Sequence, residues 1–400
     1  MRVAVVSFRL GAADGVSIEA AKWAAALRRL GCRTWTVAGG GRADVMMPGL
    51  DLDSPEPPDH ATLDQALAGA DVVVVENVLS LPRNPGAAEA LTAILRGRPA
   101  ILHHHDLPWQ RHGQFPAGAC PPDDPALRHV AINQLSRAEL AERGIDAVTV
   151  YNTIDVDTRA GRRRPARRAL RVGKQAVLVL QPTRAIARKN VPAGITVAER
   201  LGGSYWLTGP AEDGYGPALA ALLGAARCPV LRRMPPRLSM ADAYAAADVV
   251  AFPSTWEGFG NPVLEAAVFR RPLVVAGYPV LDELRQFGFR WFTVDDLDPL
   301  RAFLRSPDRR LHDWNGTLAR RFFAPTTLDA RLDALLRDVS GGPRRTRTRE
   351  PAAREPGVLE PGVLDRGVLD PGRDPARDPG RGADGGAATG STPATPRSPV

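Results

Sequence analysis

The sequence of 400 residues has few cysteines, almost no lysine and no long apolar run. Its three cysteines, Cys32, Cys120 and Cys228, lie far apart, so they indicate neither a disulfide framework nor a Cys-x-x-Cys metal site. This usage is typical of a reducing compartment, and we expect a cytoplasmic location. No stretch approaches 18 apolar residues, and the N-terminus has the pattern of a short strand rather than of a signal peptide. The sequence therefore predicts neither a membrane span nor a secretory leader.

The scarcity of lysine limits what the basic charge implies. Only three of the 52 basic residues are lysines, and the formal net charge is +8. Such a preference for arginine is typical of genomic base composition rather than of a binding function. We therefore predict no nucleic-acid partner.

Several catalytic signatures are also absent. The chain has neither the G-x-x-x-x-G-K-[ST] phosphate loop nor the G-x-S-x-G nucleophile motif. Residues 11–17, between the first predicted strand and helix, lack the G-x-G-x-x-G spacing, and no acidic residue ends the second predicted strand. Both features weigh against a dehydrogenase. Two D-x-D sequences, at 51–53 and 296–298, lie in turn-like contexts, so we predict no metal site there.

Short apolar runs alternate with amphipathic helical patterns along residues 1–340. Several runs are continuously apolar, which is typical of strands buried on both faces of a parallel sheet. Two such series predict an α/β fold with two Rossmann-like, doubly wound domains that face a central cleft. The predicted strands are 3–7, 34–38, 72–75, 100–103, 130–133 and 148–151, then 177–180, 205–207, 229–231, 249–252 and 273–275. The predicted helices include 17–30, 192–201, 241–247 and 262–269, the first of them capped by Ser17.

The composition predicts the boundaries of these domains. The N-terminal domain spans 1–158 and the C-terminal domain spans 172–310, with a helical segment at 311–340. Residues 159–171 are rich in arginine, and we interpret them as a solvated linker, with a phosphate or lipid-headgroup site as the alternative. Residues 341–400 contain Gly-Val-Leu near-repeats and no aromatic residue, so they cannot bury enough apolar surface to offset their ordering entropy. We predict a disordered low-complexity tail there.

A glycine-interrupted loop after the predicted strand at 249–252 has the composition of a ligand site. Gly258 and Gly260 have no Cβ, so their backbone N–H groups can approach a ligand closely ahead of a positive helix end. Asn261 is predicted to cap that helix and Pro262 to begin it.

Two glutamates flank the same loop. Glu265 falls in the first helical turn, where a carboxylate can hold two vicinal hydroxyls, and Glu257 lies at the opposite rim. Together with the loop they predict a site for an anion and a polyol. The alternative is a capped helix whose glutamates are favoured by the helix dipole alone.

These residues resemble a known family. Glu257 and Glu265, eight residues apart around Gly-Phe-Gly, resemble the E-x7-E motif of retaining glycosyltransferases of family 4, which have the GT-B fold. Residues 179–190 resemble the same family, because Arg184 at a strand end is followed five residues later by Lys189. A diphosphate leaving group needs such positive charge as its bond to the sugar breaks.

The resemblance implies transfer of a sugar from a nucleotide-diphosphate donor, a UDP- or GDP-sugar, to an acceptor on the N-terminal domain. It implies retention of configuration and neither metal nor cofactor. Arg184 and Lys189 would neutralise the diphosphate, and Glu265 would bind the ribose hydroxyls. The segment at 311–340 would pack back across both domains.

The resemblance also implies which residues hold the donor sugar. Glu257 and the backbone of Gly258, Phe259 and Gly260 would contact the sugar and the distal phosphate. In the N-terminal domain the resemblance is looser, and Gly15 lies where family members have a glycine turn that contacts donor and acceptor.

Three adjacent histidines follow a predicted strand of the N-terminal domain. His105 is the closest counterpart of a family histidine that reaches the reacting sugar. In an extended chain His103 and His105 share one face and His104 takes the other, and the sequence leaves open which of them faces the cleft. A metal triad is the alternative, for which we find no carboxylate at a suitable spacing.

Other functions stay open. A phosphorylase of the same fold would use inorganic phosphate in place of the nucleotide, and a non-catalytic sugar-nucleotide or glycan-binding protein would bind without turnover. Peripheral membrane contact also stays open, because Lys22, Trp23, Arg28 and Arg29 of the first predicted helix could touch an anionic surface. The acceptor, the donor base and the oligomeric state are not identified.

Overall fold

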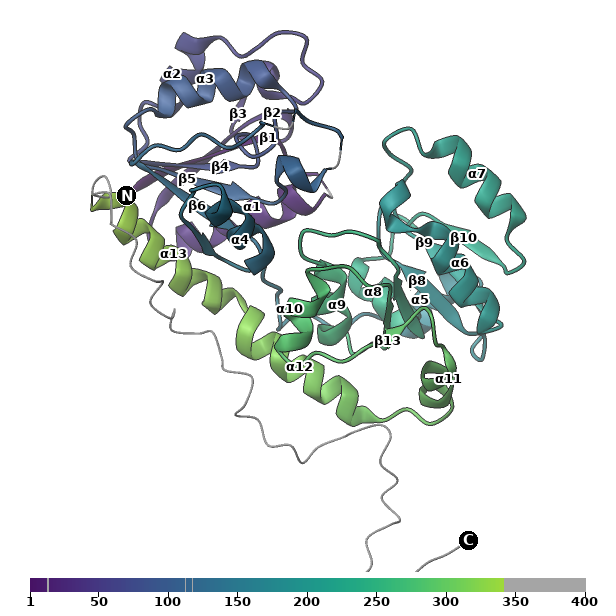
Figure 1. Ribbon diagram of the computed structural model, residues 1–400. Coiled ribbons are helices and arrows are strands. Elements are labelled where there is room, and N and C mark those ends of the chain that lie inside the picture. Colours follow the sequence, from purple (N-terminus) through teal and green to yellow (C-terminus); the bar gives the residue numbers. More distant parts are fainter. Residues whose placement is uncertain (13, 112, 117, 342–400) are drawn as a thin grey trace, which may run out of the picture. The chain divides into compact units, whose positions relative to one another are not determined.

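The computed structural model describes residues 1–341 apart from residues 13, 112 and 117, so the predicted tail lies outside the described residues except for Gly341. Within the described residues the chain forms two parallel β-sheets with helices on both faces (Figure 1). The predicted α/β fold of two Rossmann-like domains is therefore confirmed.

The first sheet has seven parallel strands in the order β3-β2-β1-β4-β5-β6-β7. They are β1 (Arg2–Leu10), β2 (Arg33–Gly41), β3 (Val45–Met46), β4 (Val72–Glu76), β5 (Ala100–His104), β6 (Leu127–Ala131) and β7 (Ala147–Thr149). Its helices are α1 (Gly15–Arg29), α2 (His60–Leu67), α3 (Pro85–Leu95) and α4 (Gln134–Glu142), with short 3-10 turns η1 (Pro48–Leu50) and η2 (Pro108–Gln110). Alternation along β1 places Val3 and Val5 in a core with α1, whereas Ala4 and Val6 pack with α2 and α3.

The second sheet has six parallel strands in the order β10-β9-β8-β11-β12-β13. They are β8 (Leu178–Gln181), β9 (Ser204–Leu207), β10 (Val230–Arg232), β11 (Val249–Phe252), β12 (Leu273–Val275) and β13 (Phe292–Thr293). Its helices are α5 (Arg163–Ala169), α6 (Val191–Arg200), α7 (Gly216–Ala225), α8 (Met240–Ala246), α9 (Asn261–Val268), α10 (Leu281–Gln286) and α11 (Asp298–Arg305), with η3 (Ala187–Lys189). Leu178 and Leu180 face α8 and α9, and Val179 faces α6 and α11.

Two C-terminal helices follow the second sheet. Helix α12 (Arg309–Phe323) packs against α9, with Phe323 in the core of the second domain. Helix α13 (Pro325–Ser340) lies along the first sheet, where Leu332 joins the core that includes α1. An ion pair between Arg29 and Asp329 at 2.7 Å ties α13 to α1. The chain thus crosses back to the domain in which it begins.

The order of the strands determines where a ligand can bind. In the first sheet, β2 and β3 lie on one side of β1, and β4 lies on the other. In the second sheet, β9 and β10 lie on one side of β8, and β11 lies on the other. The order of the strands therefore reverses between β1 and β4 and between β8 and β11. Loops diverge at such points and leave a crevice at the carboxyl ends of the strands. Residues 77–84 follow β4 at the first crevice, and residues 182–186, which include the predicted Arg184, follow β8 at the second. His105 follows β5, the strand next to β4.

Two predicted helix caps are wrong. Helix α1 begins at Gly15, and the Asp14 carboxylate accepts a hydrogen bond from the Ser17 backbone N–H at 3.0 Å, so Asp14 rather than Ser17 is the cap. Helix α9 is preceded by Gly260, whose positive φ of 116° suits glycine. Asn261 is therefore the first helical residue, and its side chain is used elsewhere.

The Arg-rich segment is not simply a solvated linker. It contains α5, and Arg167 is only 5% exposed. Its guanidinium donates hydrogen bonds to the carbonyl oxygen of Ala246 at 2.8 Å and to Asp248 at 3.0 Å. Arg163 also pairs with Asp248. These contacts attach the segment to α8 and to the start of β11, so part of its charge stabilises the second domain.

The four residues of the first helix that could touch an anionic surface differ in exposure: Arg28 and Arg29 are exposed, and Trp23 is buried. Trp23 is buried against α13 and stacks on His103, with 4.0 Å between ring centroids. Lys22 bonds to Glu19 and to the carbonyl oxygen of Thr153. Among the helices of the described residues, none is long and apolar enough to cross a membrane.

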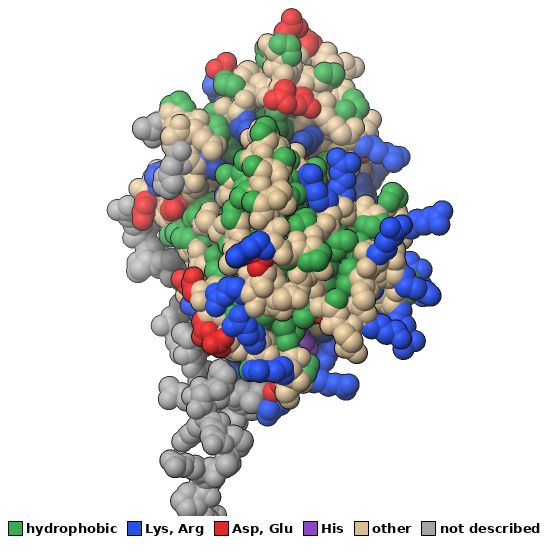
Figure 2. All heavy atoms as spheres, turned by 90° about the vertical axis from the view of Figure 1, so that its right-hand side faces the viewer, with side chains coloured by type: hydrophobic (Ala, Val, Ile, Leu, Met, Phe, Trp, Pro, Cys, Tyr) green, Lys and Arg blue, Asp and Glu red, His purple; other side chains and the backbone are tan. Residues whose placement is uncertain are grey.

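Figure 2 shows that basic side chains outnumber acidic ones on one face of the molecule.

Candidate active site

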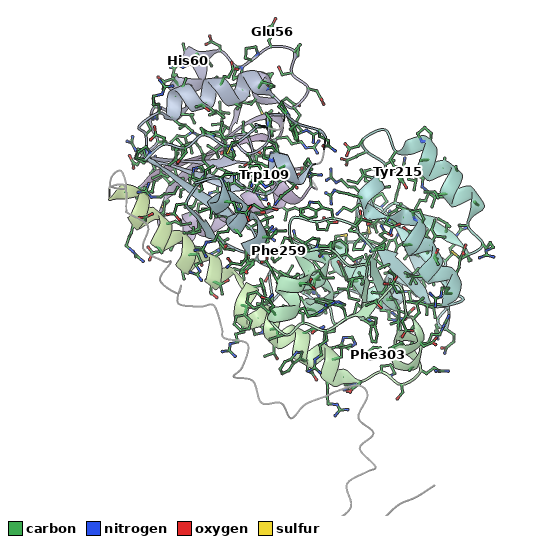
Figure 3. The ribbon with its side chains drawn as sticks, in the orientation of Figure 1. Glu56, His60, Trp109, Tyr215, Phe259 and Phe303 are labelled. Atoms are coloured by element: carbon green, nitrogen blue, oxygen red, sulfur yellow. The ribbon has the colours of Figure 1, made fainter. Side chains whose placement is uncertain are left out.

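A cavity of about 300 Å³ lies at the carboxyl ends of the two sheets. Loops after β1, β4 and β5 line it from the first domain, and loops after β8 and β11 line it with the start of α9 from the second (Figure 3). Every donor-site or catalytic residue predicted from the sequence is part of the lining. These residues are Gly15, His105, Arg184, Lys189, Glu257, Gly258, Phe259, Gly260 and Glu265.

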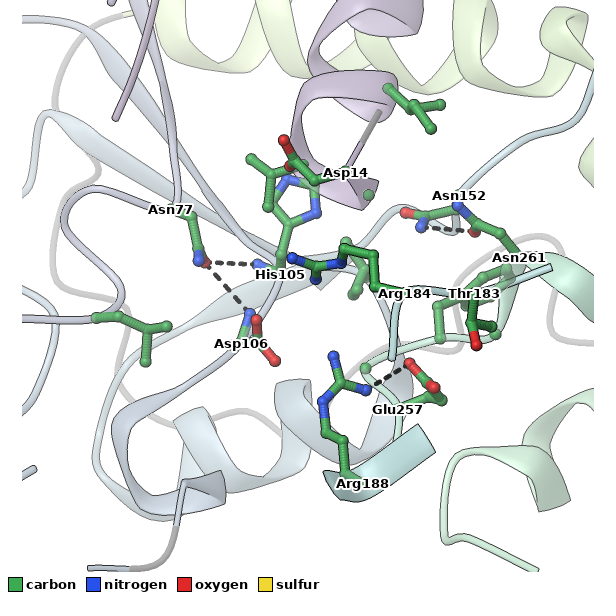
Figure 4. Close-up of a pocket in the computed structure, with 18 of the residues that line it drawn as sticks. Asp14, Asn77, His105, Asp106, Asn152, Thr183, Arg184, Arg188, Glu257 and Asn261 are labelled. Atoms are coloured by element: carbon green, nitrogen blue, oxygen red, sulfur yellow. Dashed lines mark hydrogen bonds and ion pairs between the residues drawn. The ribbon is translucent and has the colours of Figure 1, made fainter. Parts of the chain in front are cut away.

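Glu257 is buried between two cations of the second domain. Its Oε2 accepts a hydrogen bond from Arg188 at 2.8 Å (Figure 4). Its Oε1 accepts one from the Lys189 ammonium. Burial alone would raise the pKa of Glu257, but the charges of Lys189 and Arg188 outweigh it and the pKa lies below its ordinary value. Burial also lowers the pKa of Lys189, although Glu257 opposes that shift. The three groups leave one net positive charge beside the cavity.

The backbone around these cations is fixed by the second domain. The side chain of Gln181, at the end of β8, donates a hydrogen bond to the Lys189 carbonyl oxygen at 2.9 Å. The Thr255 N–H donates one to the Arg188 carbonyl oxygen, also at 2.9 Å. The turn η3 is thus attached to the strand before it and to the loop after β11, which sets both cations beside Glu257.

Arg184 supplies a third cation from the loop after β8. Its guanidinium donates to Glu212 at 2.6 Å, and the side chain is about one third exposed at 29%. In Figure 4 it extends from the second domain toward the side of the cavity that carries His105. An accessible guanidinium that keeps N–H groups toward a cavity suits a phosphate oxygen.

Glu265 lies in the first turn of α9 and lines the cavity. The Tyr244 hydroxyl donates a hydrogen bond to its Oε2, and burial raises the pKa of Glu265. Its Oε1 accepts no hydrogen bond from any residue that the structure describes. One carboxylate oxygen is therefore fixed, and the other is left for hydroxyl groups of a ligand.

The glycine loop makes close contacts that a larger residue would prevent. A Cβ on Gly258 would lie 2.6 Å from the carbonyl oxygen of His105, in the other domain. The Asn133 side chain donates a hydrogen bond to the Gly258 carbonyl oxygen. The Phe259 ring is buried against Tyr151 and Phe323, so this residue offers the cavity mainly its backbone.

The three histidines alternate as the strand pattern predicts, and His105 is the one that lines the cavity. His103 Nδ1 and His105 Nε2 both lie within hydrogen-bonding distance of Glu76 Oε2, at 2.8 and 2.7 Å. Burial would raise the pKa of Glu76, but the two rings outweigh it and the pKa falls to about 2. Burial lowers the pKa of His105, but the hydrogen bond to Glu76 and the negative charges of Glu76, Glu19 and Asp106 together outweigh it, so the pKa lies above its ordinary value.

His104 points to the other side of the sheet. Its Nδ1 lies 2.7 Å from Ser80 Oγ and its Nε2 lies 3.0 Å from His129 Nδ1. Burial, together with the neighbouring histidine, keeps the pKa of His104 well below its ordinary value. This residue is a neutral core group.

The expectation that no carboxylate accompanies the histidines is wrong. Glu76 ends β4 and lies opposite His103 in the parallel register with β5. Ligand atoms of Glu76, His103 and His105 all lie within 4.8 Å of one another, which is close enough to hold a metal ion. The hydrogen bonds above also suit an ion pair between protonated His105 and Glu76. They leave Glu76 Oε1 and His103 Nε2 buried without a hydrogen-bond partner among the described residues.

A second polar network joins the domains at the edge of the cavity. The Asn152 side chain donates to Asn261 Oδ1 at 3.1 Å, and Asn261 donates to Glu19 Oε1 at 3.4 Å. Glu19 is buried, and burial raises its pKa. Asn261, expected as a helix cap, therefore connects α9 to α1.

Sequence reasoning missed three residues of the site: Arg188, Glu76 and Asn152. Arg188 lies beside Lys189 in a motif whose spacing singles out Arg184 and Lys189 alone. Glu76 could have been found as the one acidic residue that ends an apolar strand next to the histidine strand. Asn152 gives no local signal, because its partner Asn261 is distant in the sequence.

Comparison with known proteins points to one class of enzyme. Residues 200–303, in the second domain, match a family model described as glycosyl transferases group 1. Mannosylglucosylglycerate synthases of Thermotoga maritima and Petrotoga mobilis are each 26% identical to this chain. These alignments cover 74% and 72% of this chain and 85% of each relative.

Solved structures show the same fold. Anabaena HepE in complex with UDP and glucose superposes with a TM-score of 0.66 at 17% identity, over 84% of this chain and 99% of that one. The sucrose-phosphate synthase of Thermosynechococcus elongatus gives a TM-score of 0.66 at 12% identity, over 85% and 99%. The two sheets are therefore arranged as in the GT-B fold.

Proposed function

We propose that this chain, a glycosyltransferase of the GT-B type, transfers a hexose from a UDP- or GDP-sugar to an acceptor with retention at the anomeric carbon. The observation that supports the proposal is the convergence of Arg184, Arg188, Lys189 and Glu265 on one cavity ahead of α9. Cations and helix N–H groups suit a diphosphate, and the accessible Glu265 oxygen suits the hydroxyls of a ribose.

The proposed reaction exchanges one bond at the anomeric carbon. The bond from that carbon to the diphosphate oxygen breaks, and the acceptor oxygen bonds to the carbon from the same face. The acceptor proton passes to the leaving phosphate oxygen, so no protein nucleophile is required. Arg184, Arg188 and Lys189 stabilise the negative charge that develops on the diphosphate.

His105 would contact the donor sugar from the first domain. Its Nε2 is engaged by Glu76, which leaves Nδ1 for the substrate and favours the protonated ring. A positively charged or hydrogen-bonding group there fixes the sugar against the phosphate. Glu257 and the backbone of Gly258 and Gly260 would hold the sugar from the opposite side.

We propose that the transfer needs no metal ion, because protein cations surround the position given to the diphosphate. Dialysis against EDTA should then leave donor turnover unchanged, with addition of Mg²⁺ or Mn²⁺ as the comparison. Loss of turnover that returns with a divalent cation would contradict this part of the proposal and direct attention to Glu76, His103 and His105.

The proposal is tested by thermal-shift binding of UDP, GDP, ADP and NAD to the wild type and to Glu265→Ala. We expect one nucleoside diphosphate, UDP or GDP, to stabilise the wild type and to lose most of that effect in the variant. Stabilisation by none of them would contradict the proposal. Phosphate-dependent cleavage of a disaccharide without nucleotide would instead establish a phosphorylase.

A further inference from the structure

We propose that the acceptor of this enzyme carries a carboxylate or phosphate group, which Arg83 binds together with Arg9. The inference rests on the proposed function for the location of the donor, and it adds the chemical class of the second substrate. It derives from the charges that the first domain contributes to the cavity.

Three arginines of the first domain line the cavity from three separate segments. Arg9 lies at the end of β1, Arg83 on the loop after β4, and Arg111 directly after η2. The acidic residues that this domain adds to the lining are Asp14 and Asp106. The acceptor side of the cavity therefore has an excess of positive charge.

Arg83 is the unmatched charge of this group. Its side chain is exposed, and none of the residues that the structure describes pairs with its guanidinium. It lies two residues after Leu81, which is buried and also lines the cavity. A free guanidinium presents parallel N–H groups to a carboxylate or a phosphate more effectively than to single hydroxyls.

Arg9 is only loosely held. Its Nε lies 3.4 Å from Asp14 Oδ2, and its side chain is 41% exposed. The Asp14 carboxylate already accepts hydrogen bonds from the backbone N–H and the hydroxyl of Ser17, at 3.0 and 2.8 Å. Arg9 thus retains N–H donors for a ligand. Arg111 differs, because it lies 2.7 Å from Asp106 and is largely neutralised by it.

The donor does not require these groups. The cations assigned to the diphosphate, Arg184, Arg188 and Lys189, all belong to the second domain, as does the N-terminus of α9. Arg83 and Arg9 lie on the domain that carries His105 and Asn77. An acceptor placed there meets two arginines of the lining. A site for a neutral polyol would be expected to offer amides and carboxylates instead.

The experiment measures thermal unfolding of the full-length protein saturated with the nucleoside diphosphate that binds it. Glucose, glucuronate and glucose 6-phosphate are added in turn, with KCl at matched ionic strength. Saturating nucleotide fills the diphosphate site, so an added anion reports on the remaining part of the cavity. We expect glucuronate or glucose 6-phosphate to raise the unfolding temperature of the complex more than glucose or KCl does. The anion with the larger effect identifies whether the acceptor carries a carboxylate or a phosphate.

Arg83→Ala should weaken binding of the preferred anion by about tenfold or more, because a charged hydrogen bond is lost, and should leave nucleotide binding unchanged. Arg9→Ala should have a smaller effect in the same direction. Arg33→Ala is the matched control, since Arg33 is also exposed on the first domain but lies outside the cavity lining.

Three results would overturn the inference: no stabilisation by either anion, equal stabilisation by glucose, or full retention of the anion effect in Arg83→Ala. Failure of every nucleoside diphosphate to bind would instead contradict the proposed function. The two failures are therefore distinguishable in one set of measurements.

Discussion

The ammonium of Lys189 donates a hydrogen bond to the carboxylate of Glu257, so the cation assigned to the leaving group is held by the residue assigned to the donor sugar. Arg188 bonds to the other oxygen of the same carboxylate. Charge on the diphosphate and position of the sugar are thereby linked through one buried group. A change at any of the three residues should affect both.

Replacement of Lys189 tests this link. Lys189→Met keeps the length of the side chain but removes its charge, so turnover should fall by about 100-fold or more as transition-state stabilisation is lost. Arg188 still pairs with Glu257, which should limit the loss of unfolding free energy to roughly 3 kcal/mol. Initial rates of donor consumption and urea unfolding measure the two effects. Lys174→Met, at an exposed lysine, is the control, and unchanged turnover in Lys189→Met would contradict the assignment.

Binding of the nucleotide-sugar should weaken as the pH falls. Burial raises the pKa of Glu265, so its carboxylate protonates at a higher pH than an ordinary glutamate and then accepts one hydrogen bond fewer from the ribose. Titration calorimetry between pH 8 and pH 5 should show this loss in the wild type. Glu265→Gln, which does not titrate, should bind weakly with a flatter pH profile. Parallel profiles in the two proteins would mean that another group controls binding.

Glycine at position 258 should be required for the approach of the two domains. In Gly258→Ala the new Cβ would clash with the His105 carbonyl oxygen at 2.6 Å, and we expect a loss of about 1–3 kcal/mol in unfolding free energy with weaker donor binding. Gly173→Ala is the control, because a Cβ there meets nothing within 4 Å. Equal stability of the two variants would show that the contact relaxes without cost.

The His104 ring should contribute an increase in unfolding free energy from pH 5.5 to pH 7.5. Burial lowers the pKa of His104, so the folded state binds fewer protons than the unfolded state at this ring. The contribution of this lowered pKa to the unfolding free energy is fully present above the ordinary histidine pKa. It is lost as the pH falls below that value, by at most about 1.4 kcal/mol per pH unit. Urea unfolding should show a smaller pH slope in His104→Gln. An unchanged slope would indicate that the ring binds protons equally in the folded and unfolded states, so that folding does not lower its pKa.

Much of the fold could be predicted because parallel strands buried on both faces leave continuous apolar runs. Val72 to Val75 is such a run, and it is fully buried in β4. The caps were harder, since Asp14, Gly15 and Ser17 all favour a helix start, and only the backbone geometry shows that Asp14 accepts the bond. Arg167 looked solvated because the sequence does not show that α5 packs on α8.

The site was predictable where its residues share one loop. Glu257 and Glu265 flank a single glycine turn, so spacing alone brings them together. Glu76 and His105 come from different strands, and they meet only because β4 and β5 are neighbours in the sheet. The order of strands in a sheet is a tertiary property, and local sequence patterns do not predict it.

The anomeric configuration of the product tests the central claim most directly. The protein is incubated with an α-linked UDP- or GDP-hexose as the donor. The acceptor is either the one found by screening or methanol as a simple acceptor. NMR of the anomeric proton then gives the configuration of the product. The account predicts release of one nucleoside diphosphate for each α-linked glycoside formed, with loss of both in Lys189→Met. A β-linked product, or glycoside formation that requires phosphate in place of the nucleotide donor, would contradict it.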